Sequence, residues 1–218
     1  MDEITIYQFT NGRSTFHYSN ASLKKCVRKS PIHVVKNSEL GPALNSILET
    51  CKTPYFIKVD DDFFLHPESL RFMASQIPHL PENWVFYCCI LWDNFWGEKR
   101  GNIKLYNIDA VKQVGGFHPN KYGRIDCRLL KQIKKHKKSF VMDKSSAVGI
   151  HVLGSPDDIE LHKTIWGGFS RVDNKEAKTF YGDKRGLKKI FRKRNRILEK
   201  INEEDQSKFF HWLKSRGW

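Results

Sequence analysis

Two patterns of hydrophobic and polar residues, one typical of strands and one typical of helices, alternate along the first 62 positions of the chain. Ile4 to Phe9 alternates apolar and polar residues, whereas Leu40 to Cys51 spaces its apolar residues as one face of a helix does. The pattern predicts strands at 4–9, 32–35 and 55–59, with helices at 14–26 and 40–51 between them. A β-α-β-α-β order of this kind builds a parallel sheet with right-handed crossovers.

The following residues continue to alternate between strands and helices as far as residue 151. Trp84 to Leu91 is apolar on both faces, which is typical of a central strand. The pattern predicts further strands at 84–91, 103–107, 139–142 and 147–151, and further helices at 67–77, 109–114 and 127–136. We therefore expect an α/β fold with a mixed, mostly parallel sheet flanked by helices.

The composition narrows the class of protein. With 218 residues and 39% hydrophobic content, the chain can bury the core of one medium domain with an appendage. No apolar stretch approaches the roughly 20 residues that cross a bilayer, and the acidic start, Met1-Asp2-Glu3, predicts no secretory signal. The five cysteines include no C-x-x-C pair, so we expect reduced thiols and a cytoplasmic protein.

The net charge of +14 is concentrated near the C-terminus. From Lys175 to Trp218 there are 14 Lys and Arg against 6 Asp and Glu, so this segment holds +8 of the total. We expect a main domain at 1–172 and a basic, mainly helical extension at 173–218. The extension could contact an anionic membrane surface, attract nucleic acid, steer anionic acceptors or present a solvated helical face. Of the two macromolecular partners, we favour peripheral membrane contact over nucleic acid.

Three consecutive carboxylates follow the predicted strand at 55–59. Ligands of open α/β sheets bind at the carboxyl ends of strands, where Asp60-Asp61-Asp62 falls. Adjacent carboxylates raise one another's pKa unless a cation or hydrogen-bond donors compensate. The triplet therefore suggests a divalent cation that carries phosphates, with a solvated acidic turn or a helix N-cap as the alternative.

Four motifs in a consistent order resemble the nucleotide-sugar glycosyltransferases of the GT-A fold, closest to glycosyltransferase family 2. The motifs are Leu40-Gly41-Pro42-Ala43-Leu44-Asn45 ahead of the aspartate strand, Val114-Gly115-Gly116-Phe117, Asp126-Cys127-Arg128-Leu129, and His151 on a late strand. The resemblance covers residues 4–155. It implies a Rossmann-like nucleotide-binding sheet and a bound Mn²⁺ or Mg²⁺.

The resemblance also implies roles for individual residues on the donor side. The residues expected to meet the nucleotide are Thr10, Asn11, Gly12, Arg13, Asn37, Asn45, Asp60 and Asp61. Asn37 stands where the family usually places an acidic residue against the base. The residues expected at the metal are Asp62, His151 and Asp60, with His162 and Asp157 as alternatives to the histidine. Because imidazole suits softer metals, a histidine ligand favours Mn²⁺.

On the acceptor side, the resemblance implies that Asp126 is the general base that deprotonates the acceptor hydroxyl. Ile125 occupies the usual glutamate position before it, and Asp93 and Asp109 are alternative bases. One carboxylate base acting alone would invert the anomeric carbon. Trp92, Asp93 and Trp96 could form a sugar or acceptor subsite, because sugars stack on aromatic faces, or could fill the core.

We therefore expect a metal-dependent glycosyltransferase, monomeric by default, that uses a UDP-sugar. Its acceptor would be a glycan, a lipid-linked molecule or a protein. A nucleotidyltransferase of related architecture is the rival enzyme, although Thr10-Asn11-Gly12-Arg13 is a poor phosphate loop. A basic nucleic-acid-binding module is the non-enzymatic rival, which would explain the charge but not the aspartate triplet.

Overall fold

The computed structural model describes residues 2–12, 15–27, 30–93, 98–119 and 125–151. They belong mainly to one compact unit, Met1–Trp92 with Lys99–His151. The predicted basic extension at 173–218 lies outside the described residues.

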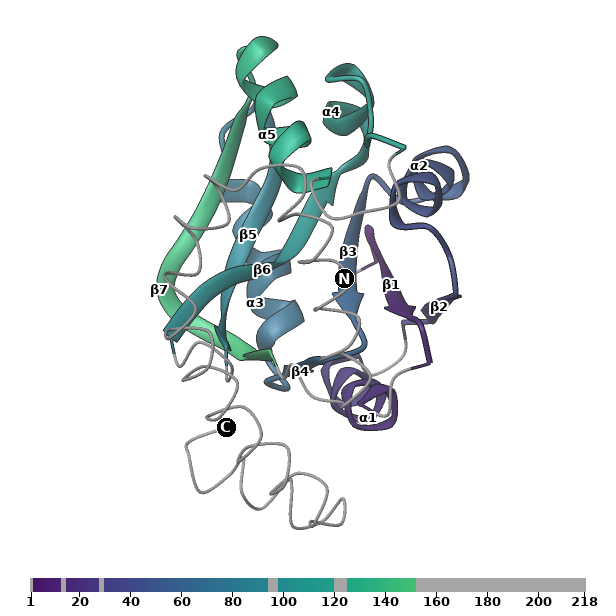
Figure 1. Ribbon diagram of the computed structural model, residues 1–218. Helices are drawn as coiled ribbons and strands as arrows, with labels where there is room; N and C mark the ends of the chain where they lie inside the picture. The colour runs from purple at the N-terminus through teal and green to yellow at the C-terminus, as the bar shows by residue number, and fades with distance from the viewer. Residues whose placement is uncertain (1, 13–14, 28–29, 94–97, 120–124, 152–218) are drawn as a thin grey trace, which may run out of the picture. The chain divides into compact units, whose positions relative to one another are not determined.

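A seven-stranded mixed sheet with helices on both faces forms this unit (Figure 1). The strand order is β2-β1-β3-β6-β5-β7-β4. The strands are β1 (Ile4–Thr10), β2 (Ile32–Lys36), β3 (Tyr55–Asp60), β4 (Phe63–Leu65), β5 (Trp84–Asp93), β6 (Glu98–Asn107) and β7 (Ser139–His151). The helices are α1 (Phe16–Cys26), α2 (Leu40–Thr50), α3 (Ser69–Gln76), α4 (Ile108–Gln113) and α5 (Ile125–Lys135), with a 3₁₀ turn, η1, at Ile77–His79. The predicted α/β class is confirmed.

The first three long strands are parallel and end at the same edge of the sheet. Strand β1 lies between β2 and β3, with Thr10 opposite Lys36 and Phe9 opposite Asp60. The crossovers are α1 and α2, which carry the helical spacing predicted for residues 14–26 and 40–51. Loops that follow β1, β2 and β3 are therefore neighbours, which is the arrangement a nucleotide site in an open sheet requires.

Antiparallel pairings build the other half of the sheet. Strand β6 runs against β3, with Asn107 opposite Tyr55, and β4 runs against β7, with Phe63 opposite His151. Strand β4 was not predicted, because three buried residues directly after the aspartates are too few to show an alternation. The two short strands predicted at 139–142 and 147–151 are one continuous strand, β7.

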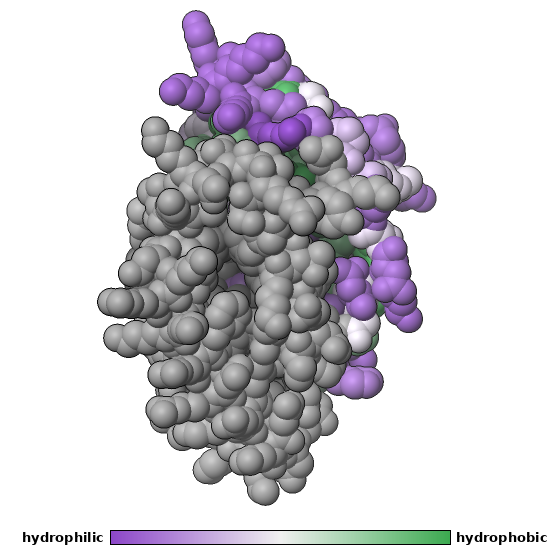
Figure 2. All heavy atoms as spheres, in the orientation of Figure 1, coloured by the Kyte–Doolittle hydropathy of each residue, from purple (hydrophilic) through white to green (hydrophobic). Residues whose placement is uncertain are grey.

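The core has two clusters, one on each face of the sheet, because successive strand residues point to opposite sides. On β3, Ile57 packs into the cluster that contains Leu23 of α1 and Met73 of α3. Phe56 packs into the cluster that contains Leu48 of α2 and Leu129 of α5. Hydrophilic side chains gather over the end of the unit where α4 and α5 lie (Figure 2). No helix in the described ranges is both long and apolar enough to cross a membrane.

Candidate functional site

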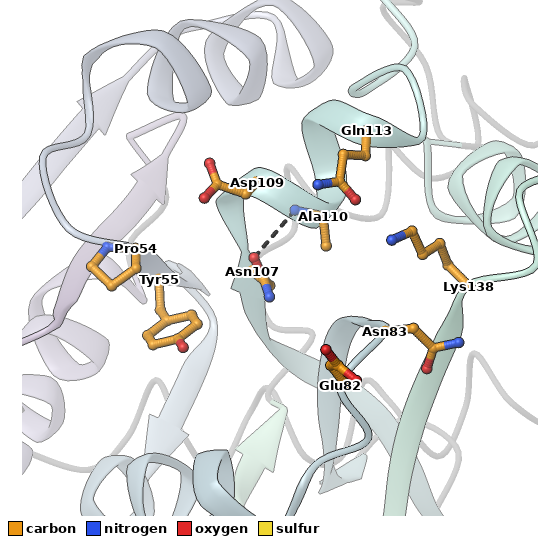
Figure 3. Close-up of a pocket in the computed structure, with 9 residues that line it drawn as sticks. All are labelled: Pro54, Tyr55, Glu82, Asn83, Asn107, Asp109, Ala110, Gln113 and Lys138. Carbon is orange, nitrogen blue, oxygen red and sulfur yellow. Dashed lines mark hydrogen bonds between the residues drawn. The ribbon is translucent and has the colours of Figure 1, made fainter.

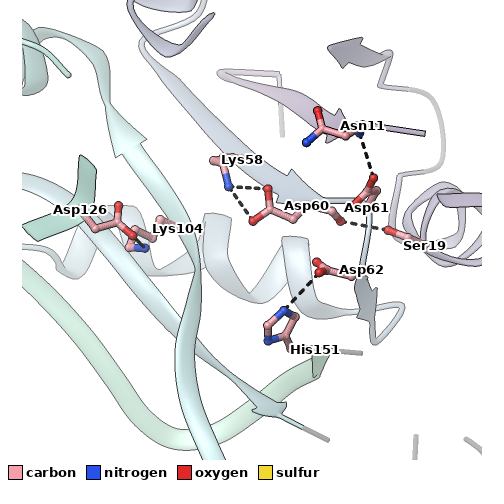
Figure 4. A network of polar contacts seen from close by, with 9 residues as sticks. All are labelled: Asn11, Ser19, Lys58, Asp60, Asp61, Asp62, Lys104, Asp126 and His151. Carbon is pink, nitrogen blue, oxygen red and sulfur yellow. Dashed lines mark hydrogen bonds and ion pairs between the residues drawn. The ribbon is translucent and has the colours of Figure 1, made fainter. Parts of the chain in front are cut away.

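The three aspartates lie where β3 ends, and their carboxylates face three different partners (Figure 4). Asp60 is the last residue of β3, while Asp61 and Asp62 form the turn into β4. Asp61 and Asp62 are buried, with 3% and 2% of their surface exposed. A solvated acidic turn is therefore excluded.

Asp61 holds the loop that follows β1. Its Oδ2 accepts a hydrogen bond of 2.6 Å from Thr10 Oγ1 and one of 3.2 Å from the backbone N–H of Asn11. Thr10 Oγ1 in turn accepts from the backbone N–H of Gly12 at 3.0 Å. Gly12 has φ +81°, a left-handed conformation that glycine adopts without strain. Arg13, the last residue of the predicted nucleotide turn, lies outside the described residues.

Asn37 lies beside this turn, at the end of β2. Its backbone N–H donates to the carbonyl oxygen of Thr10 at 3.0 Å, and its φ of +48° is left-handed. Asparagine tolerates this conformation better than most residues. Its side chain is exposed, at the edge where a base would be recognised. The contact with the base stays a prediction.

Asp62 faces His151, which the pairing of β4 with β7 brings to the triplet. The distance from Asp62 Oδ2 to His151 Nε2 is 3.4 Å. Metal bonds of about 2.1 Å that meet at roughly a right angle would separate two donor atoms by about 3.0 Å, so a small shift would admit a cation. Within the described ranges, no three His, Cys, Asp or Glu side chains form a metal-binding group. A cation here would therefore take its remaining ligands from phosphate oxygens and water.

Asp60 is paired with a lysine of its own strand. Lys58 Nζ lies 2.5 Å from Asp60 Oδ1 and 2.6 Å from Oδ2, so the ammonium bridges both oxygens. The same ammonium lies 5.6 Å from the centre of the Phe9 ring. Asp60 is thus engaged by Lys58, whereas Asp62 faces His151. The predicted role of Asp60 toward ribose or metal-bound water is untested.

Asp126 opens α5 and is held by Lys104 of β6. Lys104 Nζ donates to Asp126 Oδ2 at 2.8 Å; the lysine side chain is 12% exposed and the aspartate side chain 55%. Burial tends to raise the pKa of Asp126. The charge and hydrogen bond of Lys104, with the charge of Lys58, outweigh burial and hold that pKa below its ordinary value. Asp126 is therefore a carboxylate at neutral pH.

The two lysines link the two paired aspartates. Lys58 and Lys104 are direct partners in the antiparallel register of β3 and β6. Like charges in such positions repel, and each is here compensated by a carboxylate. The Asp60–Lys58 and Asp126–Lys104 ion pairs therefore meet at the two lysines, which lie between the two aspartates (Figure 4).

Two serines of α1, which no sequence motif indicated, fix the backbone around the triplet. Ser19 Oγ donates to the carbonyl oxygens of Phe63 at 2.8 Å and Asp60 at 3.2 Å, and accepts from Gln8 Nε2 at 2.9 Å. Ser22 Oγ accepts from the backbone N–H of Leu65 at 3.2 Å. The sequence feature that could have indicated the two serines is their three-residue spacing, which places them on the same side of the predicted helix as Cys26.

Asn45 joins two of the family-like motifs. Its Nδ2 donates to the carbonyl oxygen of Phe117 at 2.7 Å, and its Oδ1 accepts from the N–H of the same residue at 2.8 Å. Gly116 has φ +72°, which favours glycine. A Cβ on Gly41 would lie 2.2 Å from the carbonyl oxygen of His118, so only glycine fits there. The observed contact of Asn45 is with the backbone, and its predicted contact with the nucleotide is untested.

The remaining candidates lie elsewhere. Asp109 is exposed at the start of α4, next to Asn107, which pairs with the first residue of β3. It therefore lies at the opposite end of that strand from Asp60, which removes it as an alternative base. Trp92 and Asp93 end β5, but their side chains are not among those described. Trp96, Asp157 and His162 lie outside the described residues.

Comparison with known proteins identifies the architecture. No family model matches the sequence, and no curated protein matches it. Among solved structures, a mannosyltransferase from Pyrobaculum calidifontis, in complex with GDP-Man and Mn²⁺, superposes with a TM-score of 0.56 at 11% identity. That match covers 88% of this chain and 73% of the mannosyltransferase.

A second similar structure is S. aureus TarS 1–349, with a TM-score of 0.51 at 13% identity. The match covers 77% of this chain and 65% of TarS 1–349. The same TarS fragment in complex with UDP-GlcNAc gives a TM-score of 0.50 at 12% identity, covering 68% of this chain and 58% of that one. At these identities the likeness concerns the fold, and the fold of this chain is the GT-A fold of nucleotide-sugar glycosyltransferases.

Proposed function

We propose that this chain is a metal-dependent glycosyltransferase that transfers a sugar from a UDP-sugar to an acceptor hydroxyl. The observation that carries the proposal is the Asp62–His151 pair. A carboxylate only 2% exposed lies at the end of a parallel strand, 3.4 Å from an imidazole nitrogen. Oxygen and nitrogen donors placed beside a nucleotide-type turn suit a divalent cation of the Mn²⁺ kind.

In this proposal each residue around the turn has a defined task on the donor side. Asp62 and His151 hold the cation, and the turn at Thr10, tethered by Asp61, receives the nucleoside together with Asn37. When bound, the cation supplies positive charge against the diphosphate that leaves. A nucleotide-sugar donor is supported by the similar structures of a mannosyltransferase in complex with GDP-Man and Mn²⁺ and of TarS in complex with UDP-GlcNAc.

Asp126 is the proposed base on the acceptor side. Its lowered pKa keeps it ionised, and its half-exposed side chain can reach an incoming hydroxyl. It would accept the hydroxyl proton as the oxygen attacks the anomeric carbon from the side opposite the diphosphate. One displacement without a covalent glycosyl-enzyme inverts that carbon. The acceptor we propose is a glycan, a lipid-linked molecule or a protein.

Calorimetric titration of nucleotides into the full chain tests the proposal. We expect UDP to bind with Mn²⁺ present and to lose most of its affinity with EDTA, and we expect UDP to bind more tightly than GDP, CDP or ADP. Absence of metal-dependent binding for every nucleoside diphosphate would refute the metal assignment. Tighter binding of another nucleotide would refute only the choice of UDP.

A screen of UDP-sugars would follow, with release of UDP as the readout. The anomeric configuration of the product, read by NMR, tests inversion separately. A product with the donor's configuration would contradict the role of Asp126 as the only carboxylate that acts on the acceptor.

A further inference from the structure

Lys104 lies in the site but has no place in the roles described so far. Its ammonium is 2.8 Å from Asp126 Oδ2 and 6.0 Å from the centre of the Phe86 ring, and its side chain is 12% exposed. Among the described residues, this is the only hydrogen bond that the Asp126 carboxylate makes. One oxygen of the carboxylate is thus held, which leaves the second to receive a proton.

We propose that Lys104 is a positioning residue for Asp126, whose hydrogen bond fixes the direction of the carboxylate while the acceptor binds. This inference rests on the proposed function, because it assumes that Asp126 takes the acceptor proton.

The cost of burying a lysine supports a functional reason for its position. An ion pair that removes an ammonium from water gains little stability over a well-packed apolar side chain, and often none. Lys104 also lies opposite a second lysine, Lys58, which adds repulsion. Stability alone would be served as well by an apolar pair in place of both Lys104 and Asp126. The position is better explained by what the ammonium does to Asp126.

The charge environment shows what removal of Lys104 would change. Beyond the pair itself, the groups that act on the pKa of Lys104 are Cys88 of β5 and Asp60 of β3, and the group that acts on the pKa of Asp126 is Lys58 of β3. Burial lowers the pKa of Lys104, but Asp126, Cys88 and Asp60 together outweigh burial and the pKa is raised. Without Lys104, only the charge of Lys58 would remain to lower the pKa of Asp126, so that pKa would rise.

The test compares Lys104→Met, which removes the charge, with Lys104→Arg, which keeps it. We expect Lys104→Met to lower kcat about 10- to 100-fold at neutral pH, the effect of a misdirected catalytic group, with the KM for donor changed less than about twofold. The acid limb of its kcat/KM profile should move to higher pH. Lys104→Arg should recover most of kcat and return the acid limb toward the wild-type position.

A carboxyl ¹³C NMR titration reads the same contact without turnover. The signal of Asp126, assigned with Asp126→Asn, should titrate at higher pH in Lys104→Met than in wild type. Lys58→Met, which removes the cross-strand lysine but leaves the hydrogen bond, is the matched control and should shift it less. Thermal melting checks that Lys104→Met is folded. If Lys104→Met does not fold, the kcat and pH profile of Lys104→Arg serve as the test instead.

The outcomes separate this inference from the proposed function. If Asp126→Asn is inactive but Lys104→Met keeps wild-type kcat and pH profile, the inference is wrong and the proposed function stands. The inference is also wrong if Lys104→Met loses donor affinity in proportion to its loss of rate, because Lys104 would then act on the donor. If Asp126→Asn keeps wild-type turnover, the proposed base is wrong, and the inference fails with it.

Discussion

The two ends of strand β3 differ in whether the charged side chains around them are buried or exposed. At its carboxyl end, Asp61 and Asp62 are buried and bonded to other parts of the fold (Figure 4). At its amino end there is a pocket of about 670 Å³ (Figure 3). The pocket is lined by Pro54, Tyr55, Glu82, Asn83, Asn107, Asp109, Ala110, Gln113 and Lys138.

The two asparagines of this pocket are hydrogen-bonded to neighbouring parts of the fold. Asn107 Oδ1 accepts from the N–H of Ala110 and caps α4, while Asn83 donates to the carbonyl oxygen of Lys137 and accepts from Ser139. Glu82 and Asp109 are exposed, where a charge costs little. Because burial of charge is expensive, the buried aspartates make the carboxyl end the candidate site in preference to the pocket at the amino end.

The largest effect we expect comes from neutralising the buried carboxylate that faces the histidine. Asp62→Asn keeps the shape of the side chain but removes the charge that would attract a cation. We expect Mn²⁺-dependent affinity for UDP to fall by more than about 100-fold, since changes in the surroundings of a metal already cost 10- to 100-fold. Calorimetry with and without EDTA measures it. Unchanged metal-dependent binding would remove Asp62 from the site.

The next largest effect we expect is on the rate of the chemical step, with the affinity for UDP unchanged. Asp126→Asn removes the proposed base and retains the hydrogen-bond geometry available to Lys104. We expect kcat to fall by about 10² to 10⁴-fold, the usual contribution of a general base, with UDP affinity unchanged. Single-turnover kinetics beside calorimetry checks this. Loss of UDP affinity in this variant would show that Asp126 serves the donor side.

A third effect tests whether the carboxyl end depends on its buried hydrogen bonds. Ser19→Ala removes the hydroxyl shared by Asp60, Phe63 and Gln8, and leaves buried partners unsatisfied. We expect the free energy of unfolding to fall by about 1–3 kcal/mol, measured by urea denaturation. Ser75→Ala, an exposed serine that bonds only within α3, is the control and should change it by less than about 0.5 kcal/mol. Equal effects in both variants would contradict the role of Ser19 in fixing the backbone around the triplet.

Particular residues show how far the sequence could predict this fold and site. The order of elements through β3 followed from periodicity, and the position of the triplet followed from the strand before it. That Asp62 would meet His151 depended on the pairing of β4 with β7, which joins residues far apart in the sequence and leaves no local pattern. For the same reason Lys104 of β6 could not be linked to Asp126 of α5 before the packing of these two elements was known.

The three aspartates also show that a sequence motif does not reveal which role each of its residues has. Alternation along an extended strand would put Asp60 and Asp62 on one side, but the chain turns after Asp60. The structure pairs Asp60 with Lys58 and Asp61 with the loop after β1. Only Asp62 is opposite the histidine. These differences arise from the turn into β4, which was too short to predict.

The smallest effect we expect is at the amino end of β3, where the pocket lies. Asp109→Asn removes an exposed charge that lies one strand length from the triplet. We expect UDP affinity and kcat to stay within about twofold of wild type, because interactions between exposed charges that far apart are screened by salt. The same assays used for Asp62→Asn apply. A loss of kcat with acceptor but not of UDP affinity would mean that the pocket receives the acceptor, and the contrast between the two ends would then be one between donor and acceptor sites.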